Sequence, residues 1–466
     1  MTDKLELFFD AVAVFYIIYL LVYASYLFFS VALGAVRLYQ RDRMMQIKNE
    51  LKNDFYFPVS ILVPAYNEEV TILDSVKSLL DLDYHLYEVI VIDDGSSDGT
   101  SQVLIDAFQL KKVNKPIRKV IRCQDAEDVY EGSRGKVQMT LIRKKNGGKG
   151  DALNMGINAA RYPYFVCIDA DSMLQKDSIE RIVQPVMEDE HVVAVGGMIR
   201  VAQCLEMKNG KPVGYHLPWN LLTSMQAMEY DRSFLASRIL FDEFNGNLII
   251  SGAFGLFKKD VVIAAGGYDH ETLGEDMELV MKLHAFCRRN QIPYIIKYEP
   301  NAVCWSQTPA SFGDLAKQRR RWHLGLFQSM VKYKDMFFNY HFGVLGSISY
   351  LYYLLYELLS PQIEIFGLFA TVLATLTGYL NVPFMIGFYL LYAFYGAILT
   401  ITAFFQRIYT QKLKVSRYDM VKAVLMCFIE NIFFHFYLEF VRATAFIGYR
   451  NTKLQWGQIK RTRIEK

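Results

Sequence analysis

Several features are missing from this sequence, and each absence removes a functional class. The six cysteines are scattered without a Cys-x-x-Cys pair, so neither a zinc site nor a disulfide framework is indicated. Basic and acidic residues nearly balance, and a net charge of +3 gives no support to nucleic-acid binding. The glycines near residues 93–100 do not form Gly-x-Gly-x-x-Gly, which disfavours a dinucleotide cofactor. No internal repeat or low-complexity tract is present.

Apolar residues, in contrast, are abundant. Hydrophobic residues make up 52% and aromatic residues 15% of the chain, which indicates membrane segments. Residues 11–36 are almost uncharged, and about 25 helical residues span a bilayer core of about 30 Å. Basic residues follow this segment, so the positive-inside rule predicts an N-terminus outside the cell and a cytosolic domain after residue 54. These basic residues are Arg37, Arg41, Arg43, Lys48 and Lys52.

The C-terminal part, residues 341–466, is predicted to return to the membrane. Apolar runs over residues 342–380 and 384–405 predict two spans, and the basic connector and tail after them should be cytosolic. Residues 421–446 carry a polar stripe and start and end on the same side, so we expect a re-entrant or interfacial helix there. The stripe consists of Asn431, His435, Glu439 and Arg442. The chain is therefore expected to be a multi-pass protein of the plasma membrane.

Residues 55–340 read as a cytosolic α/β domain with a mostly parallel, Rossmann-like sheet. Short apolar strands are predicted at 59–63 and 88–92, with a crossover helix over 71–80 between them. Residues 124–137 predict a surface loop or short hairpin. Residues 224–240 predict a helix that packs on the core or lies on the membrane, core packing being the commoner case. Residues 247–257 predict a strand broken by glycines, where a ligand or another backbone comes close.

Pairs of acids end two of the predicted strands. Asp169 and Asp171 follow the apolar run 164–168, and Asp93 and Asp94 follow 88–92. Ligands bind at the carboxyl edge of such sheets, and two carboxylates there suit Mg²⁺ or Mn²⁺ in a nucleotide complex. Aspartate is also common in turns, so a capped strand end explains each pair equally well when it is taken alone.

Three further segments carry charge in patterns that suit phosphate and proton transfer. Residues 143–150 place Lys149 and other cations on a glycine loop that enters a helix, which suits phosphate binding. A solvated charged turn would have the same sequence pattern. Glu275 and Asp276 begin another helix, where acids also serve as ordinary caps. Residues 318–322 set three arginines beside Trp322, which fits a diphosphate and a sugar face, or else anionic lipid headgroups.

Together and in this order, the motifs resemble those of the processive membrane glycosyltransferases of family 2: cellulose, hyaluronan, chitin and poly-N-acetylglucosamine synthases. The combination of the Asp-Ala-Asp acids with Gln-x-x-Arg-Trp carries the resemblance, which extends over essentially the whole chain. It implies a GT-A fold that polymerises a β-linked glycan from UDP-glucose or UDP-N-acetylglucosamine with inversion, and passes the product through the membrane. The growing glycan, the lipid bilayer and accessory export subunits are the implied partners.

The resemblance also assigns roles to individual residues. Asp276, with Glu275 beside it, is the implied general base. Trp322, Ser251 and Gly252 are expected to contact the acceptor. Asp169 and Asp171 would hold Mg²⁺ or Mn²⁺. The implied nucleotide-sugar ligands are Ala65, Tyr66, Glu68, Asp93, Asp94, Lys149, Asp169, Gln318 and Arg321.

One position departs from the family pattern. The threonine expected before Glu275 is Gly274 here, which removes a hydroxyl and is consistent with a different acceptor or linkage. The stretch after the last apolar segment is expected to be too short for the cyclic-dinucleotide-sensing domain of some cellulose synthases. Two rival functions remain: a non-processive transferase acting on a lipid acceptor, and a catalytically silent membrane component of a polysaccharide export complex.

Overall fold

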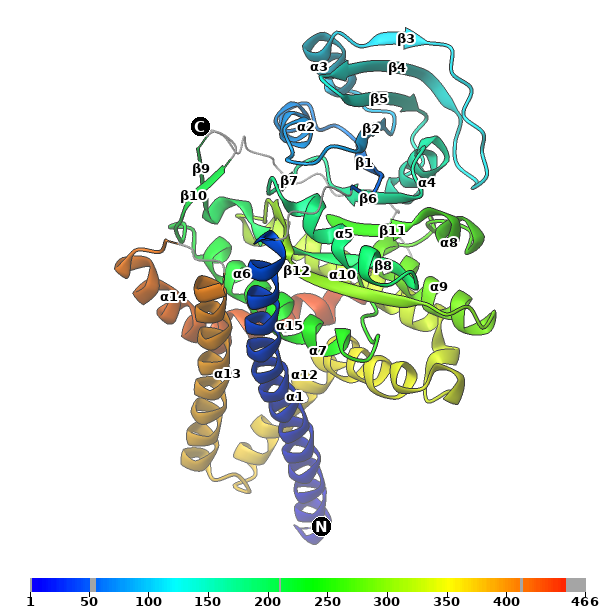
Figure 1. Cartoon of the computed structure of the whole chain (residues 1–466). Coiled ribbons are helices and arrows are strands. Elements are labelled where there is room, and N and C mark those ends of the chain that lie inside the picture. The colour runs from blue at the N-terminus through cyan, green and yellow to red at the C-terminus, as the bar shows by residue number, and fades with distance from the viewer. Residues whose placement is uncertain (1, 51–55, 209–210, 411–413, 450–466) are drawn as a thin grey trace.

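The computed structural model describes residues 2–50, 56–208, 211–410 and 414–449 (Figure 1). Among these residues, a ten-stranded sheet runs in the order β3-β4-β5-β2-β1-β6-β11-β8-β12-β7. A separate hairpin joins β9 (Leu205–Lys208) and β10 (Lys211–Tyr215). The strands of the large sheet are β1 (Val59–Ala65), β2 (Tyr87–Asp93), β3 (Lys111–Val113), β4 (Ala126–Arg134), β5 (Val137–Lys144), β6 (Tyr164–Ile168), β7 (Met173–Leu174), β8 (Val192–Val201), β11 (Phe254–Lys258) and β12 (Ile295–Ser306).

The predicted α/β class is confirmed, and the sheet proves to be mixed. Strands β5, β2, β1 and β6 are parallel neighbours, as are β8 and β12. Strand β11 lies antiparallel between β6 and β8 and so joins the two parallel parts. The region predicted as a loop or short hairpin is the antiparallel pair β4–β5. Of the segment 247–257, only β11 is a strand, so the prediction was wrong for its glycine-containing first half, which approaches the site described below.

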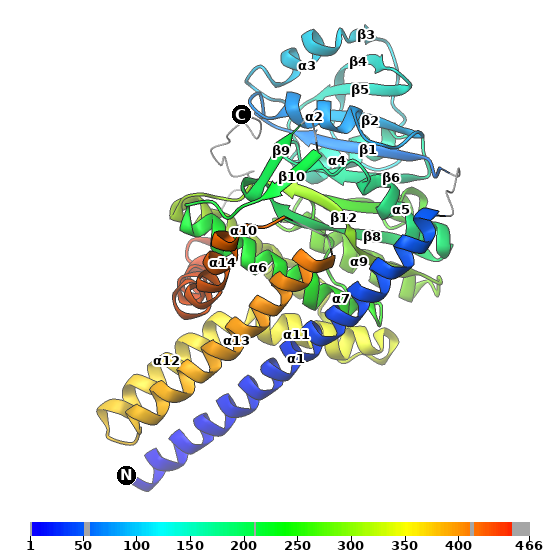
Figure 2. The same cartoon turned by 60° about the vertical axis from the view of Figure 1, so that its left-hand side comes forward.

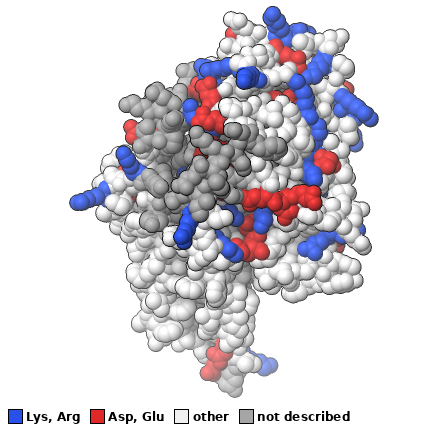
Figure 3. All heavy atoms as spheres, in the orientation of Figure 1, with Lys and Arg blue, Asp and Glu red and all other residues white. Residues whose placement is uncertain are grey.

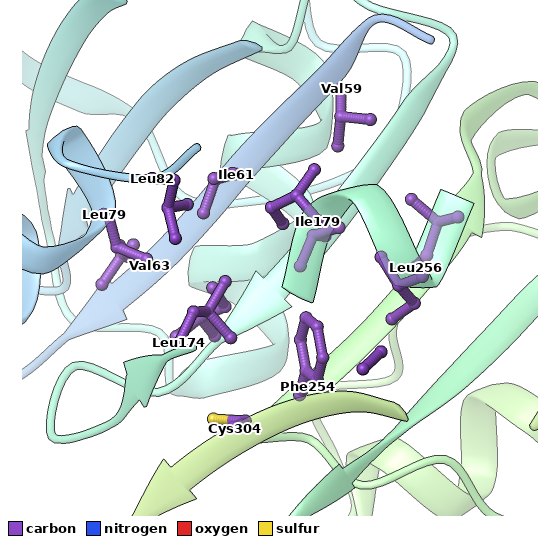
Figure 4. Close-up of a cluster of buried hydrophobic side chains, with 14 of the residues drawn as sticks. Val59, Ile61, Val63, Leu79, Leu82, Leu174, Ile179, Phe254, Leu256 and Cys304 are labelled. Atoms are coloured by element: carbon purple, nitrogen blue, oxygen red, sulfur yellow. The ribbon is translucent and has the colours of Figure 1, made fainter. Parts of the chain in front are cut away.

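Helices cover both faces of the sheet, and each face has its own apolar core. One core packs β1 against α2 (Ile72–Leu80), α3 (Thr100–Phe108) and α5 (Ser178–Glu188). Figure 4 shows part of it, with Ile61 and Val63 of β1, Leu79 of α2, Ile179 of α5 and Leu256 of β11 converging. The other core packs the sheet against α4 (Lys149–Ala159), α8 (Lys259–Ala264) and α9 (Glu275–Arg289). Strands β1 and β2 are buried along their whole length, which explains their unbroken apolar sequences.

The predicted helix over residues 224–240 packs into the protein. It runs as α6 (Leu221–Arg232), a π-helical turn η2 (Ser233–Ser237) and α7 (Arg238–Asp242). Met225, Met228, Phe234 and Leu235 are all buried, so core packing is the correct reading of its apolar side. Beside it lies α10 (Phe312–Lys332), and short turns follow at η3 (Lys334–Met336) and η4 (Tyr340–Phe342); η1 (Ala202–Cys204) precedes β9.

Long apolar helices project from the α/β domain. In Figures 1 and 2, α1 (Thr2–Glu50) and α13 (Val382–Thr410) run side by side away from it, with α12 (Ser360–Leu376) next to them. Figure 3 shows almost no charged side chains on this part of the surface except near its tip. Among the described residues, three helical stretches are long and apolar enough to cross a membrane: Lys4–Arg41, Val382–Gln406 and Arg417–Phe446. The bent pair Leu345–Leu358 and Ser360–Leu376 passes the same test when its two helices are taken together. The first of these candidate spans extends beyond both ends of the predicted residues 11–36.

The run predicted as one span over residues 342–380 is bent. Helical turns η5 (Leu345–Ser349), α11 (Tyr350–Tyr352) and η6 (Tyr353–Leu358) meet α12 at an angle of 51°, with Pro361 at the start of α12. The last helical stretch comprises α14 (Arg417–Ile429), η7 (Glu430–Phe434), α15 (His435–Ala443) and η8 (Thr444–Phe446), and lies across the upper end of α13 in Figure 1. Its interfacial placement stays a prediction, and the predicted basic tail, residues 450–466, lies outside the described residues.

Candidate active site

The carboxyl end of β6 delivers Asp169 into a cluster of charged side chains. The Lys149 ammonium lies 2.6 Å from Asp169 Oδ1 and 3.4 Å from Glu275 Oε1. Lys149 and Glu275 are the first residues of α4 and α9, so the amino ends of two helices face this strand end. Burial disfavours the Lys149 charge, but Asp169 and Glu275 raise its pKa above the ordinary value. The ammonium is thus already offset by these carboxylates, and an anionic group such as a diphosphate at this place needs a divalent cation in addition to the two helix amino ends.

Asp276 lies beside this cluster and is held in one orientation. Its Oδ2 accepts a hydrogen bond from the Gly252 backbone N–H at 3.1 Å, and its Oδ1 accepts one from the Met277 N–H at 2.8 Å. A Cβ at Gly252 would lie 2.9 Å from Lys149 Nζ, so glycine allows the close approach. Burial and the neighbouring Glu275 raise the pKa of Asp276, and Lys149 opposes the rise. An oriented carboxylate with a raised pKa is suited to proton abstraction.

Asp169 and Asp171, which follow the end of β6, differ in their surroundings. The side chain of Asp169 is 33% exposed, whereas Asp171 is buried and accepts a hydrogen bond from the Ser172 hydroxyl at 3.2 Å. Carboxylate oxygens are hard donors that suit Mg²⁺ or Mn²⁺. This donor set fits a divalent cation at the edge of the sheet, next to the amino ends of α4 and α9.

Helix α10 carries Gln318, Arg321 and Trp322, which lie three and four positions apart and so share one face of the helix. Trp322 is 41% exposed and offers a ring face to a ligand. Arg321 is half-buried and forms no ion pair or hydrogen bond within the part of the chain that the structure describes. The side-chain oxygen of Gln318 is buried and lacks a hydrogen-bond partner among these residues. Both polar groups are thus available to a bound molecule.

Arg319, between these residues, forms contacts inside the protein that the sequence analysis did not predict. Its two terminal nitrogens each lie 2.6 Å from one carboxylate oxygen of Glu229 in α6, a bidentate ion pair. The guanidinium also lies 4.8 Å from the centre of the Trp322 ring, within the range of a cation–π contact. Burial disfavours the Glu229 charge, but Arg319 holds its pKa below the ordinary value. Arg319 therefore supports the ring of Trp322 from behind.

Ala65, Tyr66 and Glu68 lie next to Asp93 and Asp94, because β1 and β2 are parallel and Ala65 pairs with Asp93 in register. The backbone N–H of Asp94 donates to the Ala65 carbonyl at 2.9 Å, and the Glu68 carboxylate accepts a hydrogen bond from the Thr71 hydroxyl at 2.8 Å. The predicted residues of the two strand ends are thus brought together at one edge.

The carboxylates of Asp93 and Asp94 are both engaged inside the protein. Asp93 accepts a hydrogen bond from the Ser96 N–H at 2.9 Å and another from the Ser101 hydroxyl. Asp94 is fully buried, pairs with the ammonium of Lys144, and accepts hydrogen bonds from the backbone of residues 147 and 148. It therefore fastens the basic glycine loop to the end of β2, and a direct contact with a nucleotide stays a prediction.

Comparison with protein families identifies the fold's relatives. Residues 60–263 match the model of glycosyl transferase family 2, and residues 164–405, more than half of the chain, match that of glycosyl transferase family group 2. The chain belongs to glycosyl transferase family group 2. The resemblance read from the motifs is thereby confirmed at the level of the family.

The chain is similar in sequence to curated glycosyltransferases. The chain is 30% identical over 294 residues to a poly-beta-1,6-N-acetyl-D-glucosamine synthase of Staphylococcus epidermidis, which covers 62% of this chain and 59% of the relative. It is also 30% identical over 288 residues to the enzyme of that name from Staphylococcus aureus strain COL, covering 61% and 58%. The chain thus spans about three fifths of the length of these curated relatives.

A solved structure shares the fold. It is a mannosyltransferase of Pyrobaculum calidifontis in complex with GDP-Man and Mn²⁺, with a TM-score of 0.51 at 18% sequence identity, covering 89% of this chain and 99% of that one. At this identity the likeness concerns the fold alone.

Packing explains why this chain has Gly274 where the related pattern has threonine. Gly274 precedes α9, and a Cβ there would meet the backbone of Gly325 in α10 at 3.0 Å. A Cβ at Gly325 would meet Gly274 Cα and N at 2.7 Å. Two glycines therefore let the helix that starts with Glu275 and Asp276 touch the helix that carries Trp322, backbone to backbone. The threonine of the related pattern would not fit this contact.

Proposed function

We propose that this protein is an inverting, processive membrane glycosyltransferase that polymerises a β-linked glycan from a UDP-sugar. UDP-N-acetylglucosamine is the favoured donor, because the curated relatives synthesise poly-beta-1,6-N-acetyl-D-glucosamine. In this proposal the α/β domain works in the cytosol, and the apolar helices guide the product across the membrane. The observation that carries the proposal is the Asp276 carboxylate, fixed by the Gly252 N–H beside the ammonium of Lys149.

In the proposed reaction Asp276 takes the proton from the acceptor hydroxyl as its oxygen attacks the anomeric carbon. Attack opposite the leaving group inverts the configuration, and the sugar–phosphate bond breaks with its electron pair going to UDP. Lys149 and Arg321 stabilise the charge that develops on the departing diphosphate. Trp322, supported by Arg319, offers its ring to the terminal sugar of the acceptor.

Asp169 and Asp171 would hold a divalent cation in this arrangement. The cation would neutralise part of the charge on the diphosphate. Mn²⁺ is the first ion to test, beside Mg²⁺, because the mannosyltransferase with the same fold was captured with Mn²⁺.

The test measures UDP release by the purified full chain in detergent. UDP-glucose and UDP-N-acetylglucosamine are compared with Mg²⁺ and Mn²⁺, and the product is sized. Asp276→Asn is expected to abolish UDP release while UDP binding is retained, because the amide cannot accept the proton. Asp106→Asn on the exposed surface of α3 is the matched control and should turn over normally. Full turnover by Asp276→Asn would refute the base, and a single added sugar would replace the polymerase by a non-processive transferase.

A further inference from the structure

Away from the sugar-transfer site, three side chains of metal-ligand type meet between two helices of the apolar region. They are Glu364 of α12 with His435 and Glu439 of α15, and their ligand atoms all lie within 4.8 Å of one another. His435 and Glu439 are four residues apart, so they share one face of α15. Helices commonly present two ligands to one metal ion with this spacing. Glu364 adds a third ligand from a helix that packs against α15.

The distances within the group suit a shared cation. His435 Nε2 lies 2.9 Å from Glu364 Oε2, and the Ser360 hydroxyl oxygen lies 3.2 Å from Glu364 Oε1 and 3.3 Å from Glu439 Oε2. Metal bonds of about 2.0–2.2 Å place neighbouring ligand atoms about 2.8–3.1 Å apart in an octahedral site and about 3.3–3.6 Å apart in a tetrahedral one. The hydroxyl has only one proton and can donate to only one of the two carboxylates. The second oxygen–oxygen approach needs either a proton on the carboxyl group or a cation beside it.

The charge balance around the group points the same way. Arg442 donates to the other oxygen of Glu439 at 3.0 Å, and Arg232 is bound by both oxygens of Glu430 at 2.8 and 2.9 Å. These two arginines are thus engaged, and among the described residues the Glu364 carboxylate is in hydrogen-bond contact with the His435 imidazole and the Ser360 hydroxyl. A carboxylate among apolar helices is costly unless a positive charge offsets it. The side chains of Glu364 and His435 are 27% and 43% exposed, so the protein itself does not enclose the group completely.

We propose that Glu364, His435 and Glu439 bind a divalent transition-metal cation, with the Ser360 hydroxyl as a further oxygen. One imidazole and two carboxylates suit Zn²⁺ or Mn²⁺ better than the all-oxygen cations Mg²⁺ and Ca²⁺. The ion clamps α12, just after its bend, to α15, which packs against α10. This site is independent of the proposed reaction and of the acids at the end of β6.

The experiment counts metal ions on the full chain in detergent, after chelation and without nucleotide. It uses an Asp169→Asn background, which removes one of the acids proposed for the other cation. Co²⁺ is the probe, because its visible spectrum reports the ligands, and Zn²⁺ competes for the site. One equivalent of Co²⁺ is expected, with at least about tenfold weaker binding in His435→Ala and in Glu439→Gln. Glu357→Gln, which removes a nearby carboxylate outside the group, should bind like the parent.

A rescue variant separates a missing ligand from a damaged fold. His435→Cys keeps a ligating side chain and should retain one equivalent of Co²⁺, with a new near-ultraviolet thiolate band. The proposal is overturned if the parent binds no Co²⁺ or Zn²⁺, or if His435→Ala with Glu439→Gln binds as tightly as the parent. It is equally overturned if His435→Cys elutes as a folded protein and binds Co²⁺ without the thiolate band. In each of these cases the group is an ion-paired network.

Discussion

The contact between Gly274 and Gly325 gives the sharpest test of how the site is built. Replacing Gly325 with alanine puts a Cβ 2.7 Å from the Cα and N of Gly274 and 3.0 Å from the carbonyl carbon of Leu273. All three neighbours are backbone atoms, so no side-chain rotation relieves the overlap. Ordinary contact begins near 3.4 Å, and the two helices must separate by about 0.7 Å to reach it.

Such a shift should be expensive for catalysis and moderate for stability. Overpacking of this kind costs about 1–3 kcal/mol of unfolding free energy. Asp276 lies two residues after Gly274, and Trp322 three residues before Gly325, so the displacement changes the distance between the proposed base and the ring proposed to bind the acceptor. A misplacement of about 1 Å lowers a rate by about 100-fold. We therefore expect turnover to fall by roughly 10- to 100-fold. The milder Gly274→Ala, with contacts of 3.0–3.3 Å, should lose less.

The assay compares UDP release and thermal unfolding of Gly325→Ala, Gly274→Ala and a control on the same helix. Gly313→Ala is the control, because a Cβ at this position in the first turn of α10 meets nothing within 4 Å. It should match the parent in both measurements. Parental turnover by a folded Gly325→Ala would refute the view that this contact sets the distance between base and acceptor.

Three further outcomes are expected. Arg319→Leu leaves the Glu229 carboxylate buried without its partner and should cost about 3–5 kcal/mol of unfolding free energy. In this variant acceptor-dependent turnover should fall more than donor hydrolysis. Equal losses in both rates would count against the view that Arg319 supports the Trp322 ring. Burial and Glu275 raise the pKa of Asp276, and the proposed base works only when it is ionised, so turnover should be lost as pH falls through that raised pKa. Glu275→Gln should move this fall in turnover to lower pH. A pH profile that does not move in this variant would contradict the assignment of Asp276. Lys144→Met removes the buried partner of two carboxylates and should lower the unfolding free energy by about 3–5 kcal/mol, whereas an unchanged unfolding curve would show that the pairing is not needed.

Much of the α/β domain was predictable because several of its strands are unbroken apolar runs in the sequence. The apolar runs behind β1, β2 and β6 are buried on both faces, so their composition reports their position directly. The glycine-containing segment before β11 misled the same reasoning. Its residues are apolar because they line the site and the core, and not because they pair with a neighbouring strand. The direction of β11 also depends on pairing with β6 and β8, which no local pattern encodes.

The arrangement of the candidate site was predictable where short motifs bring residues together and unpredictable where it depends on distant pairs. Arg319 and Glu229 are 90 positions apart, and nothing near either residue signals the partner. Gly274 was visible as a departure from the family pattern, but its reason lies in Gly325 on another helix. Lys144 looked like one of several cations on a glycine loop, and only burial distinguishes it.

Helix α6 joins α10, the helix that carries Trp322, to the apolar helices. Glu229 binds Arg319 behind the ring of Trp322, and one turn later Arg232 binds Glu430 of η7 and donates to the Thr400 hydroxyl of α13 at 3.0 Å. Residues three positions apart lie on the same side of a helix, so a single turn of α6 holds both bidentate pairs. The ring that would receive the glycan is therefore fixed relative to the helices that would conduct it. The proposed processive mechanism needs this rigidity, because each added sugar must advance along a path that keeps its alignment with the proposed base Asp276.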